Sequence, residues 1–284
     1  MVTDSWDLGR RVLSFERRPL VMGILNVTPD SFSDGGRYED PATAIEAAVR
    51  MDADGADIID IGGESTRPYS DPLCARDELS RVMPVVEGLA GRLSAPISID
   101  TSKATVAEAA ILAGAEIIND VTGLAGDPQM PDVVVQHRVG VCVMHMRGTP
   151  QTMQDDLSYD DVVEEICRYL VQRRQFCLDL GLSAPHICLD PGIGFGKSHE
   201  QNLQLLRATR RLVALGSPLL IGHSRKGFIG KILGDKSADR GAATLGVSLA
   251  VAAAGAHVIR VHDVKPTVDA LKSFEAVGGL GTAN

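Results

Sequence analysis

Aromatic residues are scarce in this sequence: Phe, Trp and Tyr together make up 4% of its 284 residues. The core must therefore be built mostly from Ala, Val, Ile and Leu, which favours layers of helices and strands over an aromatic-rich β-sandwich. A basic tract is also lacking, and the formal net charge is -9. Nucleic acids and anionic membranes are therefore poor partners for the surface as a whole, although a small anionic ligand still fits a local group of Arg and Lys.

Cysteine pairs and long apolar runs are lacking as well. The five cysteines show no CxxC spacing, which predicts reduced, mostly buried thiols and argues against a metal site built from them. The first residues contain no apolar segment of the kind that a secretory signal needs. The longest weakly charged stretch, residues 242–256, is too short and too rich in alanine to cross a bilayer. We therefore expect a soluble cytoplasmic protein without a membrane segment.

Three segments resemble one another: DGADIIDI (54–61), AGAEIIND (113–120) and AGAHVIRV (254–261). Each has a glycine where a preceding helix would end. A short apolar run typical of a buried strand follows, with a polar residue at or near its end. The pattern indicates a helix-to-strand unit that recurs along the chain.

Five further apolar runs fit the same role and bring the candidate strands to eight: 20–25, 97–99, 141–144, 187–189 and 219–221. Helical patterns lie between them, at 42–53, 76–93, 105–113, 131–138, 159–180, 202–215, 241–254 and 267–276. This alternation predicts a (β/α)8 TIM barrel, with an open doubly wound sheet as the alternative. No linker divides the chain, so residues 1–284 are expected to form one domain, whose short N-terminal extension, 1–18, plugs the bottom of the barrel.

A polar residue or a glycine stands at the end of every expected strand. Barrels of this kind carry their sites at the carboxyl ends of the strands, where the following loops meet. Cationic or imidazole groups recur at these places: Arg67, Arg147, Lys197, Arg225, Lys226, Arg260 and His262. For Arg147 or Lys197 alone, a solvated surface cation is the better interpretation. For the group we favour an anionic ligand such as phosphate or pyrophosphate, although an internal carboxylate would also satisfy Arg260.

Carboxylates form a second group at the strand ends. Asp100 and Asp190 directly follow the runs ISI and ICL, and desolvated carboxylates there need several hydrogen-bond donors. The N–H edge of a nucleobase or a pterin supplies such donors. For Asp60 and Asp120, a structural role and a ligand-binding role stay equally open. Asn26 fits either a turn or a neutral oxygen ligand for Mg²⁺.

The glycine-rich stretch GIGFGK (192–197) has the spacing of neither a dinucleotide-binding nor a Walker A loop. Together, however, the strand-end motifs resemble those of the dihydropteroate synthase family. They are GILNVTPDSFSDGG, DIGGESTRP, SIDTSKA, INDVTG, MHMRGTP, LDPGIGFGK, SRKGFIG and RVHDV, and they run in order from about residue 19 to 271. The resemblance implies a pterin-binding TIM barrel that joins a dihydropterin methyl diphosphate to p-aminobenzoate. It also implies release of pyrophosphate with Mg²⁺, inhibition by sulfonamides and a homodimer.

The resemblance further implies roles for individual residues. The pterin ring is expected to contact Asp100, Asn119, Met144, Asp190 and Lys226. The p-aminobenzoate pocket is expected to include Phe32, Thr66, Pro68 and Phe195. Pyrophosphate is expected to bind Asn26, Arg67, Arg260 and His262, with Asn26 also at the Mg²⁺ ion. Catalysis is expected to depend most on Asp100, Lys226 and Arg67.

Two features of the sequence add to what the resemblance implies. Gly227 stands where many relatives have a serine, so the aminobenzoate carboxylate would depend on backbone N–H or on Lys226. The stretch 241–255 is apolar nearly all round, and we expect it to form the dimer contact. Two alternatives remain open: a pterin-binding barrel that transfers a methyl group, and a paralogue that binds pterin without turnover.

Overall fold

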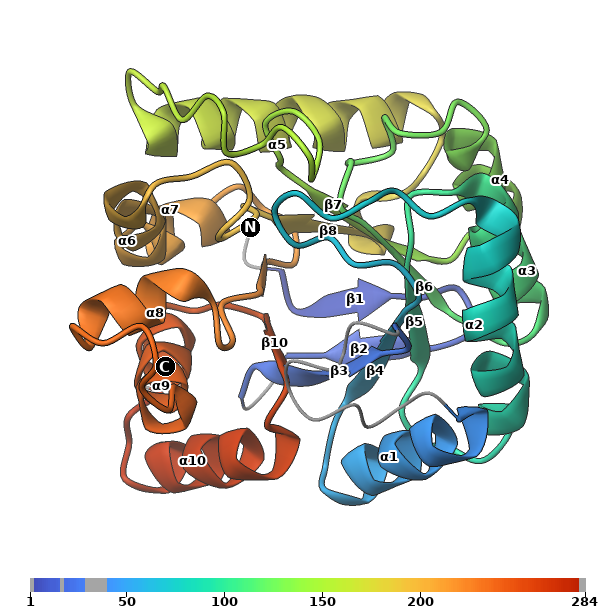
Figure 1. Cartoon of the computed structure of the whole chain (residues 1–284), viewed down its shortest axis with the longest axis horizontal. Helices are drawn as coiled ribbons and strands as arrows, with labels where there is room; N and C mark the ends of the chain where they lie inside the picture. Colours follow the sequence, from blue (N-terminus) through green and yellow to red (C-terminus); the bar gives the residue numbers. More distant parts are fainter. Residues whose placement is uncertain (1–2, 16–17, 29–39, 281–284) are drawn as a thin grey trace.

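The computed structural model describes residues 3–15, 18–28 and 40–280. Its main sheet has eight parallel strands in the spatial order β8-β7-β6-β5-β4-β3-β10-β9. A parallel bridge between Leu189 and Leu219 joins the two edges, so the sheet closes into the predicted TIM barrel (Figure 1). The strands are β3 (Leu20–Asn26), β4 (Ile58–Gly62), β5 (Ile97–Asp100), β6 (Ile117–Asp120), β7 (Gly140–Met144), β8 (Ile187–Asp190), β9 (Leu220–Ile221) and β10 (Val258–Val261).

Helices surround the barrel (Figure 1). They are α1 (Pro41–Ala53), α2 (Ala75–Leu89), α3 (Ala104–Leu112), α4 (Met130–His137), α5 (Val162–Asp179), α6 (His199–Arg207), α7 (Thr209–Val213), α8 (Gly227–Ile232), α9 (Gly241–Ala253) and α10 (Val264–Ala276), with a 3₁₀ turn at Ala184–His186. The single helix expected at 202–215 is divided at Ala208, where the buried Thr209 hydroxyl donates to the carbonyl of Leu206. The short helix α8 was not expected, because six residues are too few to show a helical period. No helix in the described part of the chain is both long and apolar enough to cross a membrane.

The bottom of the barrel is apolar and closed. Side chains alternate between the two faces of a strand, so every second residue points inward. The lowest inward positions form one buried cluster with Trp6 and Leu8 of the N-terminal hairpin, β1 (Ser5–Asp7) and β2 (Val12–Ser14). The Trp6 indole N–H donates to the carbonyl of His186 at 3.0 Å. The expected plug at the bottom is therefore confirmed for the residues that the structure describes.

The next inward layer, towards the carboxyl ends of the strands, is polar. The register pairs Asp60 with Ser98 and Asp100 with Asn119 across neighbouring strands, and it pairs Met144 with Asp190. The same alternation that buries the apolar layer therefore brings carboxylates, an amide and a hydroxyl to one level inside the barrel. This polar layer forms the floor of the candidate site.

Candidate active site

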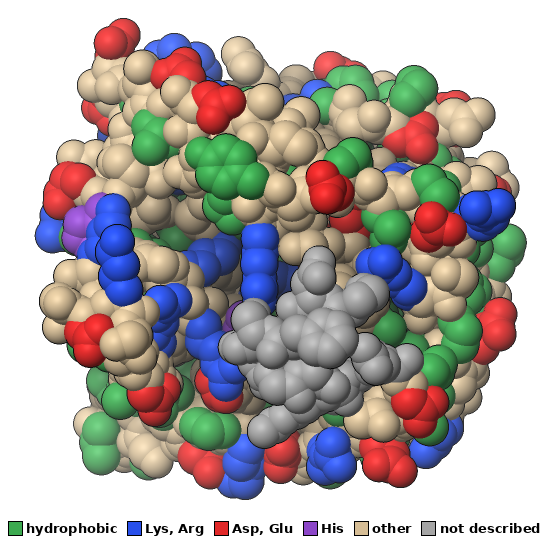
Figure 2. All heavy atoms as spheres, viewed as in Figure 1, with side chains coloured by type: hydrophobic (Ala, Val, Ile, Leu, Met, Phe, Trp, Pro, Cys, Tyr) green, Lys and Arg blue, Asp and Glu red, His purple; other side chains and the backbone are tan. Residues whose placement is uncertain are grey.

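A cavity of about 1270 Å³ opens above the polar layer, between the loops that follow the strands. Figure 2 shows Lys and Arg side chains gathered around a hollow in this face. Most of the residues predicted for the site line this one cavity: Asn26, Thr66, Arg67, Pro68, Asp100, Phe195, Lys226, Arg260 and His262. The predicted Asn119, Met144 and Asp190 are buried at the strand ends of the layer below. Phe32 lies outside the described residues.

The floor of the cavity is an ion-pair network centred on Arg260 of β10. Its Nε donates to Asp60 at 2.6 Å and its Nη2 donates to Asp100 at 2.7 Å. Asp60 is fully buried and also accepts hydrogen bonds from Ser98 Oγ at 2.6 Å and Asn119 Nδ2 at 3.2 Å. The structural role left open for Asp60 is therefore the one observed, and Arg260 has internal carboxylate partners as well as a place on the cavity wall.

The network changes the protonation behaviour of its members. Burial raises the pKa of Asp100 to about 7, and Asp60 adds to this effect while Arg260 opposes it. Burial disfavours the charge of Arg260, but Asp60 and Asp100 outweigh it and raise the pKa of Arg260 above its ordinary value. Arg260 therefore remains charged, whereas Asp100 changes its charge close to neutral pH.

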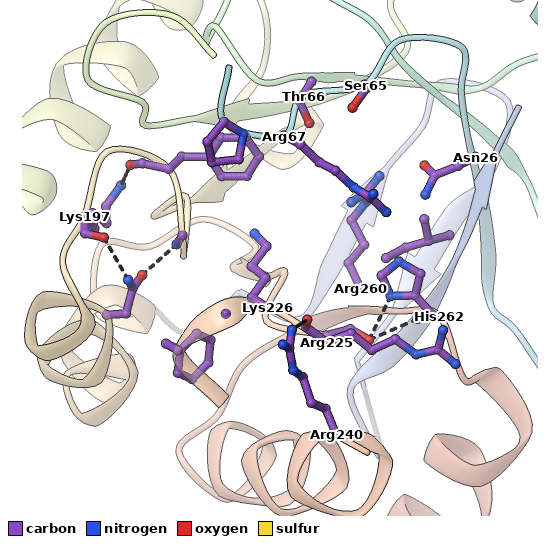
Figure 3. Close-up of a pocket in the computed structure, with 18 of the residues that line it drawn as sticks. Asn26, Ser65, Thr66, Arg67, Lys197, Arg225, Lys226, Arg240, Arg260 and His262 are labelled. Atoms are coloured by element: carbon purple, nitrogen blue, oxygen red, sulfur yellow. Dashed lines mark hydrogen bonds between the residues drawn. The ribbon is translucent and has the colours of Figure 1, made fainter. Parts of the chain in front are cut away.

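Lys226, just before α8, projects into the middle of the cavity (Figure 3). Its ammonium group donates to the carbonyl of Ile193 and lies 4.5 Å from the centre of the Phe195 ring. Burial lowers the pKa of Lys226 to about 8, and the charge of Asp190 partly offsets that shift. Burial also raises the pKa of Asp190, whose carboxylate accepts the Gly192 N–H at 2.7 Å. A half-buried lysine above the floor and a buried carboxylate below it are thus both partly removed from water.

The loop that contacts Lys226 is held from its other side by Lys197. The Lys197 ammonium donates to the carbonyls of Phe195 and Gly192, at 2.7 and 2.9 Å, and lies 3.1 Å from Nδ1 of His145. Gly192 has φ +67, and a Cβ there would lie 2.0 Å from the carbonyl oxygen of His145, so only glycine fits. The interpretation of Lys197 as a solvated surface cation is wrong, because its exposed fraction is 3%.

The rim of the cavity carries further cations that the sequence analysis did not select. Lys231, Lys236 and Arg240 come from α8 and the turn after it, away from any strand end. Arg240 donates to the backbone carbonyl of Arg225 at 2.8 Å, and Arg225 has the left-handed φ of +56. No strand-end signal marks these residues, so sequence reasoning had no means of selecting them.

The charges divide the cavity into two zones. Buried carboxylates on the floor, Asp100 and Asp190, suit a ligand edge that presents N–H donors. Cations and an imidazole around the wall, including Arg67 and His262, suit a phosphate or diphosphate group (Figure 3). His262 lies with its Nδ1 3.0 Å from Ser224 Oγ. A flat heterocycle that carries a diphosphate matches both zones.

Comparisons with known proteins agree with this chemistry. The chain matches the pterin binding enzyme family over residues 22–262. It is 45% identical to the dihydropteroate synthase of Neisseria meningitidis serogroup C, over 98% of this chain and 99% of that protein. The Yersinia pestis dihydropteroate synthase, solved as a sulfonamide drug complex, is similar with a TM-score of 0.91 and 42% identity, over 96% of this chain and 98% of that one.

The dihydropteroate synthase of Xanthomonas albilineans gives two further matches. Its structure with 4-aminobenzoic acid has a TM-score of 0.89 and 44% identity, over 97% of this chain and 98% of that one. Its complex with 7,8-dihydropteroate has a TM-score of 0.85 and 42% identity, over 96% of this chain and 98% of that one. The chain therefore belongs to the pterin binding enzyme family, among the dihydropteroate synthases.

Proposed function

We propose that the protein joins a dihydropterin methyl diphosphate to p-aminobenzoate and releases 7,8-dihydropteroate and pyrophosphate. The observation that carries the proposal is the union, in one cavity, of buried carboxylates with a cationic wall. The relatives solved with 4-aminobenzoic acid and with 7,8-dihydropteroate support it. The five cysteines are free thiols, which accords with a cytoplasmic enzyme.

The test is direct. The purified protein is incubated with the pterin diphosphate, p-aminobenzoate and Mg²⁺, and both 7,8-dihydropteroate and pyrophosphate are measured. Equal amounts of the two products are expected. Binding of the pterin without any product would indicate a non-catalytic paralogue, and methyl transfer from a methylated pterin would indicate the other class of pterin-binding barrel.

The carboxylates are proposed to read the pterin ring. Asp100 and Asp190 would accept ring N–H groups, with Asn119 beside Asp100 in register and Met144 packed at the same level. Lys226 would contact the ring from the side of the Phe195 loop. Because these groups are desolvated, a ligand that leaves their hydrogen bonds unmade loses much of its affinity.

The cations are proposed to stabilise the departing diphosphate. Cleavage of the carbon–oxygen bond leaves positive charge beside the pterin ring and negative charge on the pyrophosphate. Arg67, Arg260 and His262, which line the cavity, would bind that negative charge, and the carboxylate of Asp100, which also lines the cavity, would lie near the ring. Preorganised charges of this kind stabilise a transition state without any reorganisation at the moment of reaction.

Mg²⁺ fits this arrangement as an ion bound mainly through the substrate. Among the described residues, no three His, Cys, Asp or Glu side chains come together in a way that would hold a metal ion. Asn26, however, ends β3 and contributes its side chain to the cavity wall. Mg²⁺ prefers few protein oxygens together with phosphate oxygens and water. Asn26 would therefore hold the ion, which would supply positive charge to the pyrophosphate.

The p-aminobenzoate pocket is proposed at the outer part of the cavity, beside Thr66, Pro68 and Phe195, with Phe32 as the expected fourth member. Gly227 lies there at the start of α8, and a Cβ on it would meet no atom of the described residues within 4 Å. A serine hydroxyl, as expected in many relatives, therefore has no counterpart at this position. Backbone N–H groups or Lys226 would receive the aminobenzoate carboxylate instead.

Sulfonamide binding should depend on the first substrate. Two of the residues proposed for this pocket, Thr66 and Pro68, share the loop 63–74 with Arg67, which is proposed to bind pyrophosphate. If pyrophosphate fixes that loop, the apparent affinity of an aminobenzoate mimic depends on the fraction of protein in the closed state. Calorimetric titration of a sulfonamide should show weak or no binding to the protein alone and clear binding with a pterin, Mg²⁺ and pyrophosphate present. Equal affinity in both titrations would mean that the pocket is preformed.

The pH dependence of kcat/KM for the pterin diphosphate should have two limbs. The rate should rise as pH passes about 7, where Asp100 becomes ionised, and fall as pH passes about 8, where Lys226 loses its proton. The active form carries the Asp100 carboxylate and the Lys226 ammonium. Burial is the main cause of both shifted pKa values, so it sets the pH of both limbs. Initial rates over a pH series measure them, and kcat/KM reports the free enzyme. A flat profile through pH 8 would show that the Lys226 charge does not matter.

The proposed homodimer would use the outer face of α9. Ala242, Gly246, Ala250 and Ala253 are exposed along this helix, and a Cβ on Gly246 meets no atom within 4 Å in the part of the chain that the structure describes. A large side chain there is tolerated by the protomer but blocks close contact with a second helix. Light scattering at micromolar concentration should give a dimer for the parent and a monomer for Gly246→Arg. A monomeric parent would contradict the proposal.

A further inference from the structure

Three charged side chains form a group beside the cavity: Glu64, Glu78 and Lys103. The Lys103 ammonium, in the connection from β5 to α3, lies 2.6 Å from an oxygen of Glu64 and 2.6 Å from an oxygen of Glu78. Glu78 belongs to α2 and is fully buried, and its Oε1 has no hydrogen-bond partner among the described residues. Lys103 is therefore the cation that the two carboxylates share.

Glu64 closes the loop that follows β4. Its Oε1 accepts the backbone N–H of Leu73 at 2.7 Å, which links the first turn of the loop 63–74 to its last residues. The segment between them carries Thr66, Arg67 and Pro68 into the cavity. Glu64 itself lines the cavity, but Lys103 and Glu78 do not. The position of the Glu64 carboxylate therefore influences the positions of Thr66, Arg67 and Pro68 in the cavity.

We propose that Lys103 is a positioning residue: it fixes the loop 63–74 by holding Glu64 against the buried carboxylate of Glu78, and so shapes the pocket for the arylamine substrate. Lys103 acts through Glu64 and touches no substrate. The inference rests on the proposed function, because that function identifies the arylamine as the occupant of the pocket.

Charge, rather than size, makes the lysine necessary. Burial disfavours the Lys103 ammonium, but its hydrogen bonds to Glu64 and Glu78 raise its pKa, so it stays charged. Without it, two carboxylates would face each other, one of them fully buried. Glu78 is fixed within α2, whereas Glu64 lies on a loop. Glu64 is therefore the carboxylate that moves, and its link to Leu73 moves the loop with it.

The first experiment replaces Lys103 with methionine, which keeps the length of the side chain but removes its charge. We expect KM for p-aminobenzoate to rise about tenfold, with a smaller change in kcat and an unchanged affinity for a pterin inhibitor. Lys265→Met is the matched control, because Lys265 also pairs with a carboxylate, Asp269, on the exposed outer face of α10. The control should leave all three quantities unchanged. An unchanged KM for Lys103→Met would overturn the proposal.

The second experiment restores the link without the lysine. In Lys103→Met/Glu78→Gln, the amide of the new glutamine can donate to Glu64 and the like charges no longer face each other. KM for p-aminobenzoate should return to within about threefold of the parent value, as it should in Lys103→Arg, which keeps a cation between the carboxylates. If the double variant is no better than Lys103→Met, the lysine acts through packing and the proposal is wrong.

A third measurement is independent of turnover. Hydrogen exchange of the Leu73 amide should accelerate in Lys103→Met and recover in the double variant, because this amide donates to Glu64. Thermal unfolding establishes that each variant is folded, and Lys103→Gln serves as the charge-free variant if methionine prevents folding. Failure of the parent enzyme to make dihydropteroate would contradict the proposed function. Unchanged Leu73 exchange in the charge-free variant would contradict the role of Lys103 alone.

Discussion

Lys226→Ala is expected to lower kcat/KM for the pterin diphosphate by a factor on the order of 100 to 1,000, the size of effect seen when one preorganised donor is removed from a desolvated site. The Lys226 ammonium is held between the carbonyl of Ile193 and the ring of Phe195, and its burial lowers its pKa to about 8. Alanine leaves the charge of Asp190 without this nearby cation. Both ring binding and the transition state should suffer.

Steady-state kinetics with both substrates measure the loss, and calorimetry with a pterin inhibitor measures its binding component. Lys272→Ala, on the exposed side of α10, is the control and should keep full activity. A Lys226→Ala enzyme within a factor of two of the parent would refute the catalytic role assigned to this lysine.

Arg260→Met is expected to lower the free energy of unfolding by about 3–5 kcal/mol, because it leaves a buried carboxylate without its cation. Asp60 is fully buried and receives the Arg260 Nε at 2.6 Å, and Asp100 receives Nη2 at 2.7 Å. The remaining donors to Asp60, from Ser98 and Asn119, are neutral. Urea unfolding followed by circular dichroism measures the loss.

The double variant Asp60→Asn/Arg260→Met separates the two roles of the arginine. It removes the buried charge together with its partner, so most of the lost stability should return. Activity should not return, because the cavity still lacks the cation proposed to bind pyrophosphate. If Arg260→Met unfolds within about 1 kcal/mol of the parent, the buried ion pair does not hold the barrel floor as described.

The barrel itself could be predicted from local features of the sequence. Short apolar runs bounded by glycine and polar residues, repeated at similar spacing, predict buried strands alternating with helices. The closure between β8 and β9 agrees with the barrel that this pattern predicts. The plug was expected only from the short N-terminal segment, and the structure identifies Trp6 and Leu8 as its buried side chains. Short or broken elements were not predicted: the sequence indicated neither α8 nor the division at Ala208, because too few residues there carry a period.

For the candidate site too, some residues could be predicted from the sequence and others could not. Strand-end positions such as Asp100 and Lys226 are visible in the sequence because the carboxyl ends of parallel strands meet at one face. Lys197 was misassigned, because its burial depends on a loop whose carbonyls turn inward through left-handed glycines. Arg240 was missed because it follows no strand end, and the sequence does not show that its guanidinium bonds to the carbonyl of Arg225 at the cavity.

The sequence by itself determined the order of strands and helices, the face that carries the polar residues and the family, because each depends on local periodicity or on motifs of contiguous residues. Only the tertiary structure decided which charge pairs with which. Arg260 could have met a ligand or a carboxylate, and it meets Asp60 and Asp100. Lys103 meets Glu64 and Glu78 across three separate segments. Such pairings depend on distances between strands and loops that are far apart in the chain, and Coulomb energies at contact distance vary too steeply with separation and burial to follow from residue type alone.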